Sequence, residues 1–255
     1  MKRTVLIVLS VMACTASWAY LGEVVSSYAS PAGVQTRGLA ISASYLFVVD
    51  GTNPGIVYRV VTETGSLRNW YQVGWSGSNS GLAWTPSSNL WVGCPSNNRV
   101  YRCAAPNGSI HYSWNAGHDP YGCAPLCSGD NGAGTSYLYT TDSAPSGLFN
   151  HQLNTGSIVR SITIPNSSDY DCAYDWRNRL VWLGDSPNVI YGYTNAASVA
   201  GSFIAPANQP RGLAYSASYL YVGCASNGYI YKVHCPEGFV GVEPASLGDV
   251  RALFR

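Results

Sequence analysis

The chain has 255 residues, of which 11% are charged, whereas about 25% are charged in a typical soluble domain. Its formal net charge is +1 and its lysines and arginines form no basic stripe, which argues against nucleic acid as a partner. The abundance of tyrosine (19), tryptophan (8) and glycine (27) suits a sheet protein with many tight turns and disfavours a helical bundle.

Residues 1–19 have the composition of a secretion signal. The segment consists of the basic Lys2 and Arg3, the apolar run 4–13 and a small-x-small cleavage site at Ser17-Trp18-Ala19. That run is too short to cross a bilayer, and no later segment reaches the ~18 apolar residues of a membrane span. Attachment of a lipid to Cys14 is an alternative to cleavage after Ala19, because residues 11–14 loosely resemble a bacterial lipobox. We expect a protein that is secreted or held in the cell envelope (periplasm or outer surface), with no transmembrane segment in the mature chain.

One sequence repeat occurs five times after this segment. Its copies begin at residues 38, 81, 122, 171 and 212 with Gly-Leu-Ala or a variant of it, and a second apolar run follows each. A period near 40 residues made of short apolar strands is the sequence signature of a β-propeller. Strand positions are clearest in the second copy, at 81–84, 90–93, 99–102 and 109–114. Turns rich in Asn and Gly join them and favour the positive φ angles of tight hairpins.

The number of strands predicts how the ring closes. The fifth copy ends at Val233 without a fourth strand, whereas residues 22–31 resemble the fourth strand at 200–206 and precede the first copy. We therefore expect an all-β fold, a five-bladed β-propeller with four-stranded blades, in which the N-terminal strand completes the last blade. This closure leaves no open edge to the ring. The propeller is predicted over residues 20–238.

Residues 239–255 are predicted to form a C-terminal tail. Ser246 is a candidate N-cap for a short helix. The apolar face of that helix would comprise Leu247, Val250, Leu253 and Phe254. Two interpretations stay open: a terminal flap, or a tag for sorting or docking in the envelope.

The last repeat carries a family resemblance. Its residues Pro210-Arg211-Gly212-Leu213-Ala214, followed by 219–222 and 228–231, are similar to the repeat of the NHL and SMP-30/gluconolactonase-like propellers. The resemblance covers residues 22–233 and implies the fold but no single activity, because these propellers include enzymes, receptors and scaffolds. Five blades are fewer than the six usual there. The secreted five-bladed glutaminyl cyclases have a similar size and blade number, but the Glu-Gly-Leu that begins their innermost strand is missing here.

The residue just before each innermost strand is expected at the mouth of the central channel. These residues are Arg37, Ser80, Tyr121, Tyr170 and Arg211, with Trp75 and His118 in the loops nearby. Two arginines and two tyrosines in one ring suit a carboxylate, a phosphate or the face of a sugar. The alternative is structural, in that Arg37 and Arg211 would only donate hydrogen bonds to neighbouring loop carbonyls.

Acidic residues near the same mouth are the candidates for catalysis. They are Asp119, Asp169 and Asp171, and His118 beside Asp119 is the one histidine placed for such a role. Asp171 replaces the glycine of the other repeats, so we expect its carboxylate to reach a neighbouring strand or the channel. The sequence has no calcium loop of the Asp-x-Asp-x-Asp-Gly type and no histidine pair with metal-ligand spacing. Hence no metal and no cofactor is predicted.

Seven cysteines follow the signal segment: Cys94, Cys103, Cys123, Cys127, Cys172, Cys224 and Cys235. Export permits disulfides, but an odd count leaves at least one free thiol. Cys94 and Cys224 share one repeat position, and Cys123 and Cys172 share another. This recurrence favours small packing residues in buried strands.

Together these features predict an exported binding module rather than an enzyme. We expect a glycan, a peptide or a small anion at the channel mouth, or another envelope protein as the partner. Two alternatives remain, a hydrolase or lyase that uses the channel aspartates and a structural cell-surface protein. Substitution distinguishes them, because a binder loses affinity without Arg37 and Arg211, whereas an enzyme loses turnover without its aspartate. A structural protein loses neither.

Overall fold

The structure is a computed structural model that describes residues 20–51, 55–73, 80–85, 89–126, 136–143, 146–164, 171–185 and 187–238. Several predicted features lie outside these residues: the secretion signal with Cys14, the C-terminal tail 239–255, Trp75, Cys127, Asp169 and Tyr170. No helix in the described ranges is long and apolar enough to span a membrane.

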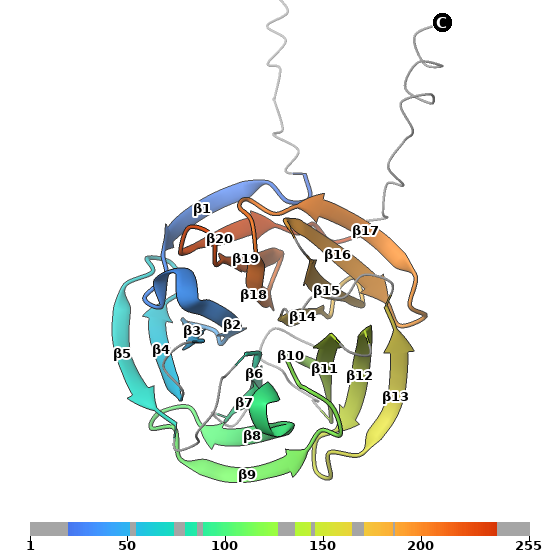
Figure 1. The fold of residues 1–255 in the computed structure, drawn as a ribbon. Coiled ribbons are helices and arrows are strands. Elements are labelled where there is room, and N and C mark those ends of the chain that lie inside the picture. Colours follow the sequence, from blue (N-terminus) through green and yellow to red (C-terminus); the bar gives the residue numbers. More distant parts are fainter. Residues whose placement is uncertain are drawn as a thin grey trace, which may run out of the picture.

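Five four-stranded antiparallel sheets surround a central axis as the blades of a propeller (Figure 1). We number the blades in chain order and count their strands outward from the axis. Apart from two short 3-10 turns, η1 (Gly33–Gln35) and η2 (Pro95–Asn97), the described residues form no helix. This confirms the predicted all-β, five-bladed propeller.

The strands of the five blades are as follows. Blade 1 has β2 (Thr36–Ile41), β3 (Tyr45–Asp50), β4 (Ile56–Val61) and β5 (Leu67–Gln72), and blade 2 has β6 (Leu82–Thr85), β7 (Asn89–Cys94), β8 (Arg99–Ala104) and β9 (Ile110–Asn115). Blade 3 has β10 (Gly122–Leu126), β11 (Tyr137–Ser143), β12 (Ser146–Gln152) and β13 (Ile158–Thr163). Blade 4 has β14 (Cys172–Asp175), β15 (Leu180–Asp185), β16 (Val189–Thr194) and β17 (Val199–Ile204). Blade 5 has β18 (Pro210–Ser216), β19 (Tyr219–Cys224), β20 (Tyr229–His234) and, as its outermost strand, β1 (Val24–Ala29).

The ring closes through the first strand of the chain. Strand β1 pairs antiparallel with β20, with Tyr28 opposite Ile230. Two backbone hydrogen bonds extend the pairing, from Gly22 N to His234 O (2.9 Å) and from His234 N to Glu23 O (2.8 Å). The predicted closure is therefore confirmed, and the third strand of blade 5 has no open edge.

Burial falls from the axis outward. All six residues of β7, a second strand, are buried, whereas in the outermost β5 only Tyr71 is buried. The hydrophobic cores lie between neighbouring blades, as where Phe47 of blade 1 stacks on Trp84 of blade 2 with ring centroids 5.2 Å apart. The six cysteines of the described ranges are buried free thiols, so they act as small packing residues, as the repeat positions predicted.

Crowding at the axis explains the glycine of the repeat. A Cβ atom on Gly38 would lie 2.0 Å from Ser80 O, and one on Gly81 would lie 2.3 Å from Cys123 N. The innermost strands of neighbouring blades therefore approach too closely there for any side chain. Blade 4 has Asp171 instead of glycine at this position of the repeat, and the Asp171 side chain is buried at the axis.

Candidate functional site

The Asp171 carboxylate links blades across the central axis. Its Oδ2 accepts hydrogen bonds from Leu39 N of blade 1 (2.9 Å) and Leu213 N of blade 5 (3.1 Å). Its Oδ1 accepts one from Cys123 N of blade 3 (3.1 Å). The side chain is completely buried. The expectation that this carboxylate reaches neighbouring strands is thus confirmed.

Two opposing effects act on the acidity of Asp171. Burial raises the pKa of its carboxyl well above the usual range, while backbone N–H donors from Leu39, Leu213, Cys123 and Cys172 lower it. Both oxygens are engaged by backbone donors of the ring itself. The geometry of this candidate catalytic residue is that of a structural acceptor that holds the innermost strands together.

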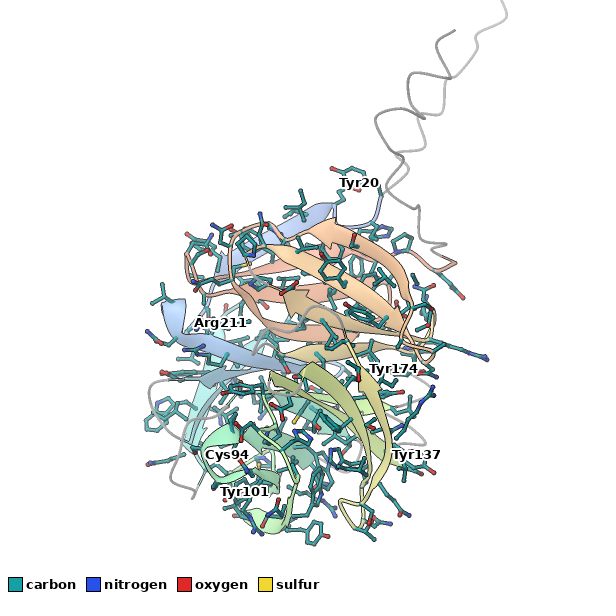
Figure 2. All side chains as sticks on the ribbon, turned by 45° about the vertical axis from the view of Figure 1, so that its right-hand side comes forward. Tyr20, Cys94, Tyr101, Tyr137, Tyr174 and Arg211 are labelled. Carbon is teal, nitrogen blue, oxygen red and sulfur yellow. The ribbon has the colours of Figure 1, made fainter. Side chains whose placement is uncertain are left out.

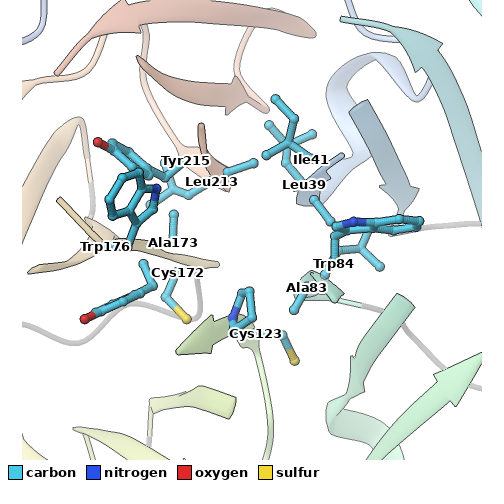
Figure 3. Close-up of a pocket in the computed structure, with 15 residues that line it drawn as sticks. Leu39, Ile41, Ala83, Trp84, Cys123, Cys172, Ala173, Trp176, Leu213 and Tyr215 are labelled. Atoms are coloured by element: carbon cyan, nitrogen blue, oxygen red, sulfur yellow. The ribbon is translucent and has the colours of Figure 1, made fainter. Parts of the chain in front are cut away.

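A pocket of about 400 Å³, including its open mouth, lies on the axis beside this carboxylate (Figure 3). Its walls are residues of the five innermost strands, together with Trp176 from the turn that follows β14. The aromatic lining residues are Trp84, Tyr174, Trp176 and Tyr215. Figure 3 shows Trp84 on one side of the opening and Trp176 with Tyr215 on the other. None of the described lining residues is charged, so the pocket suits a neutral, apolar group.

Neighbouring groups hold the aromatic walls in place. Trp84 stacks on Phe47, with an angle of 10° between the rings. The Tyr215 hydroxyl donates to Ala217 O (2.6 Å), and burial, together with the nearby Asp175 carboxylate, raises its pKa. The Arg177 guanidinium lies 5.1 Å from the ring centroid of Trp176. These contacts pre-form the pocket before any ligand arrives.

The predicted mouth residues lie at the other end of the same strands. Arg37 and Arg211 are half-buried near the start of β2 and β18, whereas the pocket begins at Leu39 and Leu213. In Figure 2, Arg211 lies toward one face of the ring and Tyr174 toward the other. None of the described members of the predicted binding set, which are Arg37, Ser80, His118, Tyr121 and Arg211, lines the pocket. A ligand at their mouth of the channel stays a prediction.

The predicted site residues that the structure describes near that mouth contact strands and loops close to them. The Arg37 side chain packs over Gly51, where an added Cβ would lie 2.3 Å from Arg37 Cγ. Ser80 is buried, and its backbone N–H donates to Gly93 O (3.1 Å). The backbone N–H of Tyr121 donates to Thr141 O (2.9 Å). Asp119 is exposed, and the amide of Asn98, turned so that its nitrogen faces the carboxylate, donates to Asp119 Oδ1.

His118 belongs to a buried polar network in blade 3. Its Nε2 lies 2.9 Å from Thr140 Oγ1, which in turn lies 2.9 Å from His151 Nε2. His151 Nδ1 donates to Gly156 O (2.9 Å), so its Nε2 accepts from the threonine hydroxyl when the ring is neutral. The His118 Nδ1 atom faces Asp142 Oδ2 at 3.7 Å. The hydrogen bonds thus run from His118 through Thr140 to His151.

Burial opposes protonation of both imidazoles. It lowers the pKa of His118, against the attraction of Asp142 and Asp119, and it lowers the pKa of His151 to about 4. The His151 ring stacks on Trp114 (centroids 4.7 Å apart) and the His118 ring on Phe149 (4.1 Å). Neither ring lines the pocket. In the described ranges, no three residues among His, Cys, Asp and Glu are arranged to hold a metal ion.

Reasoning from the sequence singled out His118 but missed His151 and Thr140. A signal was present, because Thr140 stands where the other four repeats have an aliphatic residue, namely Val48, Val92, Leu183 and Val222. A hydroxyl at a buried strand position needs a partner. That need predicts a polar neighbour within blade 3.

Comparisons with known proteins inform the fold. No protein family and no curated protein matches the sequence. The crystal structure of Myxococcus xanthus glutaminyl cyclase is similar, with a TM-score of 0.67 and 11% identity over 84% of this chain and 95% of that chain. A chain in the crystal structure of the mitotic checkpoint complex has a TM-score of 0.50 and 14% identity, over 78% and 63%. The likeness shows a shared fold. At such identities it assigns no activity.

Proposed function

We propose that this protein is an exported binding module that receives an apolar side chain of a partner peptide in the axial pocket. The observation that carries the proposal is the lining of that pocket, whose described residues include four aromatic ones and no charged one. Burying aromatic and aliphatic anchors in a preformed pocket is the usual source of affinity in peptide recognition. Export rests on residues 1–19.

The lining favours a peptide over the other two ligand classes that the sequence suggested. A small anion would enter without a cation to pair with, at a full desolvation cost. A glycan stacks on tryptophan but also needs several side-chain hydrogen bonds, and most of the lining is aliphatic, alanine or cysteine. A phenylalanine or leucine side chain needs none.

Acid–base catalysis in the pocket has less support. The lining residues that the structure describes include no aspartate, glutamate or histidine, and the oxygens of Asp171 are engaged by backbone donors. A hydrolase or lyase that uses channel aspartates, as the sequence suggested, needs an accessible carboxylate at the reacting group. The resemblance of the repeat to NHL and SMP-30-like propellers, which include receptors and scaffolds, supports a binding role equally well.

Substitution at the pocket wall tests the proposal. We expect the full chain to bind neutral peptides that contain phenylalanine or leucine, and Trp176→Ala to weaken this binding by about two- to tenfold, because a buried aromatic contact is lost. Trp70→Ala is the matched control, since Trp70 is 57% exposed on β5 and remote from the pocket lining. Calorimetric titration of the three proteins measures the effect.

Three results would contradict this function. Equal binding of the same peptides with serine in place of the apolar residue would exclude an apolar anchor. An equal loss of affinity in Trp70→Ala would place the peptide contact on the outer surface of the ring. Binding of phosphate or acetate that disappears in Arg37→Ala/Arg211→Ala, without any peptide binding, would move the site to the opposite mouth of the channel.

A further inference from the structure

Hydrogen bonds to blade 4 hold the last described residues of the chain, 236–238. After β20, residues 236–238 run along the turn between the first two strands of blade 4. There Asn178 Nδ2 donates to Pro236 O (3.0 Å), and Gly238 N donates to Asn178 Oδ1 (2.9 Å). Arg177 forms an ion pair with Glu237 (3.4 Å). A single asparagine side chain therefore holds both Pro236 and Gly238, the last described residue.

The turn after β14 carries both this anchor and one wall of the pocket. Asn178 follows Trp176 by two residues, and Trp176 lines the pocket on the side of Tyr215. Arg177 connects the two features, because its guanidinium pairs with Glu237 and also lies over the Trp176 ring. Residues 239–255 thus follow a segment that is hydrogen-bonded to the turn carrying Trp176, a lining residue of the pocket.

The composition of residues 239–255 matches that pocket. The segment ends in Leu253-Phe254-Arg255, and its charged residues are Glu243, Asp249, Arg251 and Arg255. The linker from Gly238 to Phe254 is 16 residues long, which as a flexible coil spans about 20–24 Å. Such a linker gives an effective concentration on the order of millimolar. That is enough to keep a weak apolar anchor bound within its own chain.

We propose that Leu253 and Phe254 occupy the axial pocket in the free protein, as an internal competitor that a partner peptide must displace. The inference rests on the proposed function, since it names what regulates the same site. The apolar pair would lie among Trp84, Trp176 and Tyr215, while the flanking charged residues stay in water. A second copy of the chain or an outside peptide would be the alternative occupant.

Photo-crosslinking detects this occupant directly and needs no outside ligand. The full chain carries p-benzoylphenylalanine in place of Phe254, and the products are mapped by mass spectrometry. We expect crosslinks within one chain to residues of the pocket wall. The same photo-amino acid in place of Glu243 is the control and is expected to give none there. Crosslinks elsewhere, no crosslinks, or crosslinks between chains at low protein concentration would overturn the inference.

Competition provides the second measurement. A synthetic peptide of residues 246–255 is titrated into the full chain and into Leu253→Ser/Phe254→Ser. The double variant is expected to bind the peptide about tenfold more tightly, the ratio of a millimolar effective concentration to a Kd of about 0.1 mM. Asp249→Ser/Arg251→Ser is the matched control within the same segment, and its affinity should equal that of the unmodified chain.

The outcomes separate the two proposals. Equal affinity in all three proteins, with crosslinks outside the pocket, overturns the internal competitor and leaves the binding function intact. Crosslinks inside the pocket, without any binding of outside peptides even by the double variant, support the internal contact and overturn the proposed function. Absence of both overturns both.

Discussion

Replacing Asp171 with alanine is expected to lower the free energy of unfolding by about 3–6 kcal/mol. The substitution leaves the N–H groups of Leu39, Cys123 and Leu213 buried without their acceptor, and each orphaned donor costs about 1–3 kcal/mol. These groups belong to blades 1, 3 and 5, so the loss acts on the whole ring. A chain of this size should melt roughly 10–20 °C lower.

Urea unfolding followed by circular dichroism measures this effect. Glu63→Ala is the control, because Glu63 is an exposed carboxylate at a turn of blade 1, and its stability should stay within about 0.5 kcal/mol of the unmodified chain. The free energy of unfolding of Asp171→Asn provides a second comparison. The NH₂ group of this variant would face backbone N–H donors where a carboxylate oxygen now accepts their hydrogen bonds. A loss below about 1 kcal/mol in Asp171→Ala would show that the three N–H groups find other acceptors.

Acidification is expected to weaken the contribution of the blade 3 histidine network to stability. Burial lowers the pKa of His151 from 6.5 to about 4 in the folded protein. Between those pH values the unfolded chain binds a proton that the folded chain does not, so stability falls as the pH is lowered. The full shift amounts to about 3 kcal/mol by pH 4. His118, whose pKa is also lowered, contributes with the same sign.

The variant His151→Asn isolates this contribution. The Asn amide can still donate toward Gly156 O but does not titrate, so the loss of stability between pH 7.5 and 4 should shrink by about 3 kcal/mol. His111→Asn is the matched control, because His111 is exposed on β9. Urea unfolding at several pH values measures the slopes. Equal slopes in His151→Asn and the unmodified chain would contradict the assignment.

The architecture could be predicted from the sequence because each blade is a local unit. Its four strands follow one another within about 40 residues, so strand patterns and turn residues are enough to recognise it. Ring closure was also predictable, since a spare strand at residues 22–31 and a missing one after Val233 admit one pairing. Even the special role of Asp171 was visible as an acid in a glycine position.

The position of the pocket and the partners of the buried polar groups depended on the tertiary structure. Five innermost strands, each about 40 residues from the next, meet at the axis only when the ring is closed. Which end of the channel is filled then depends on side-chain volume. The Asp171 carboxylate fills the axis between Leu39, Cys123 and Leu213. Small alanine side chains and aromatic rings at the wall leave the axial pocket open beside it. The repeat determines which residues face the axis, but packing among all five blades decides where space remains for a ligand.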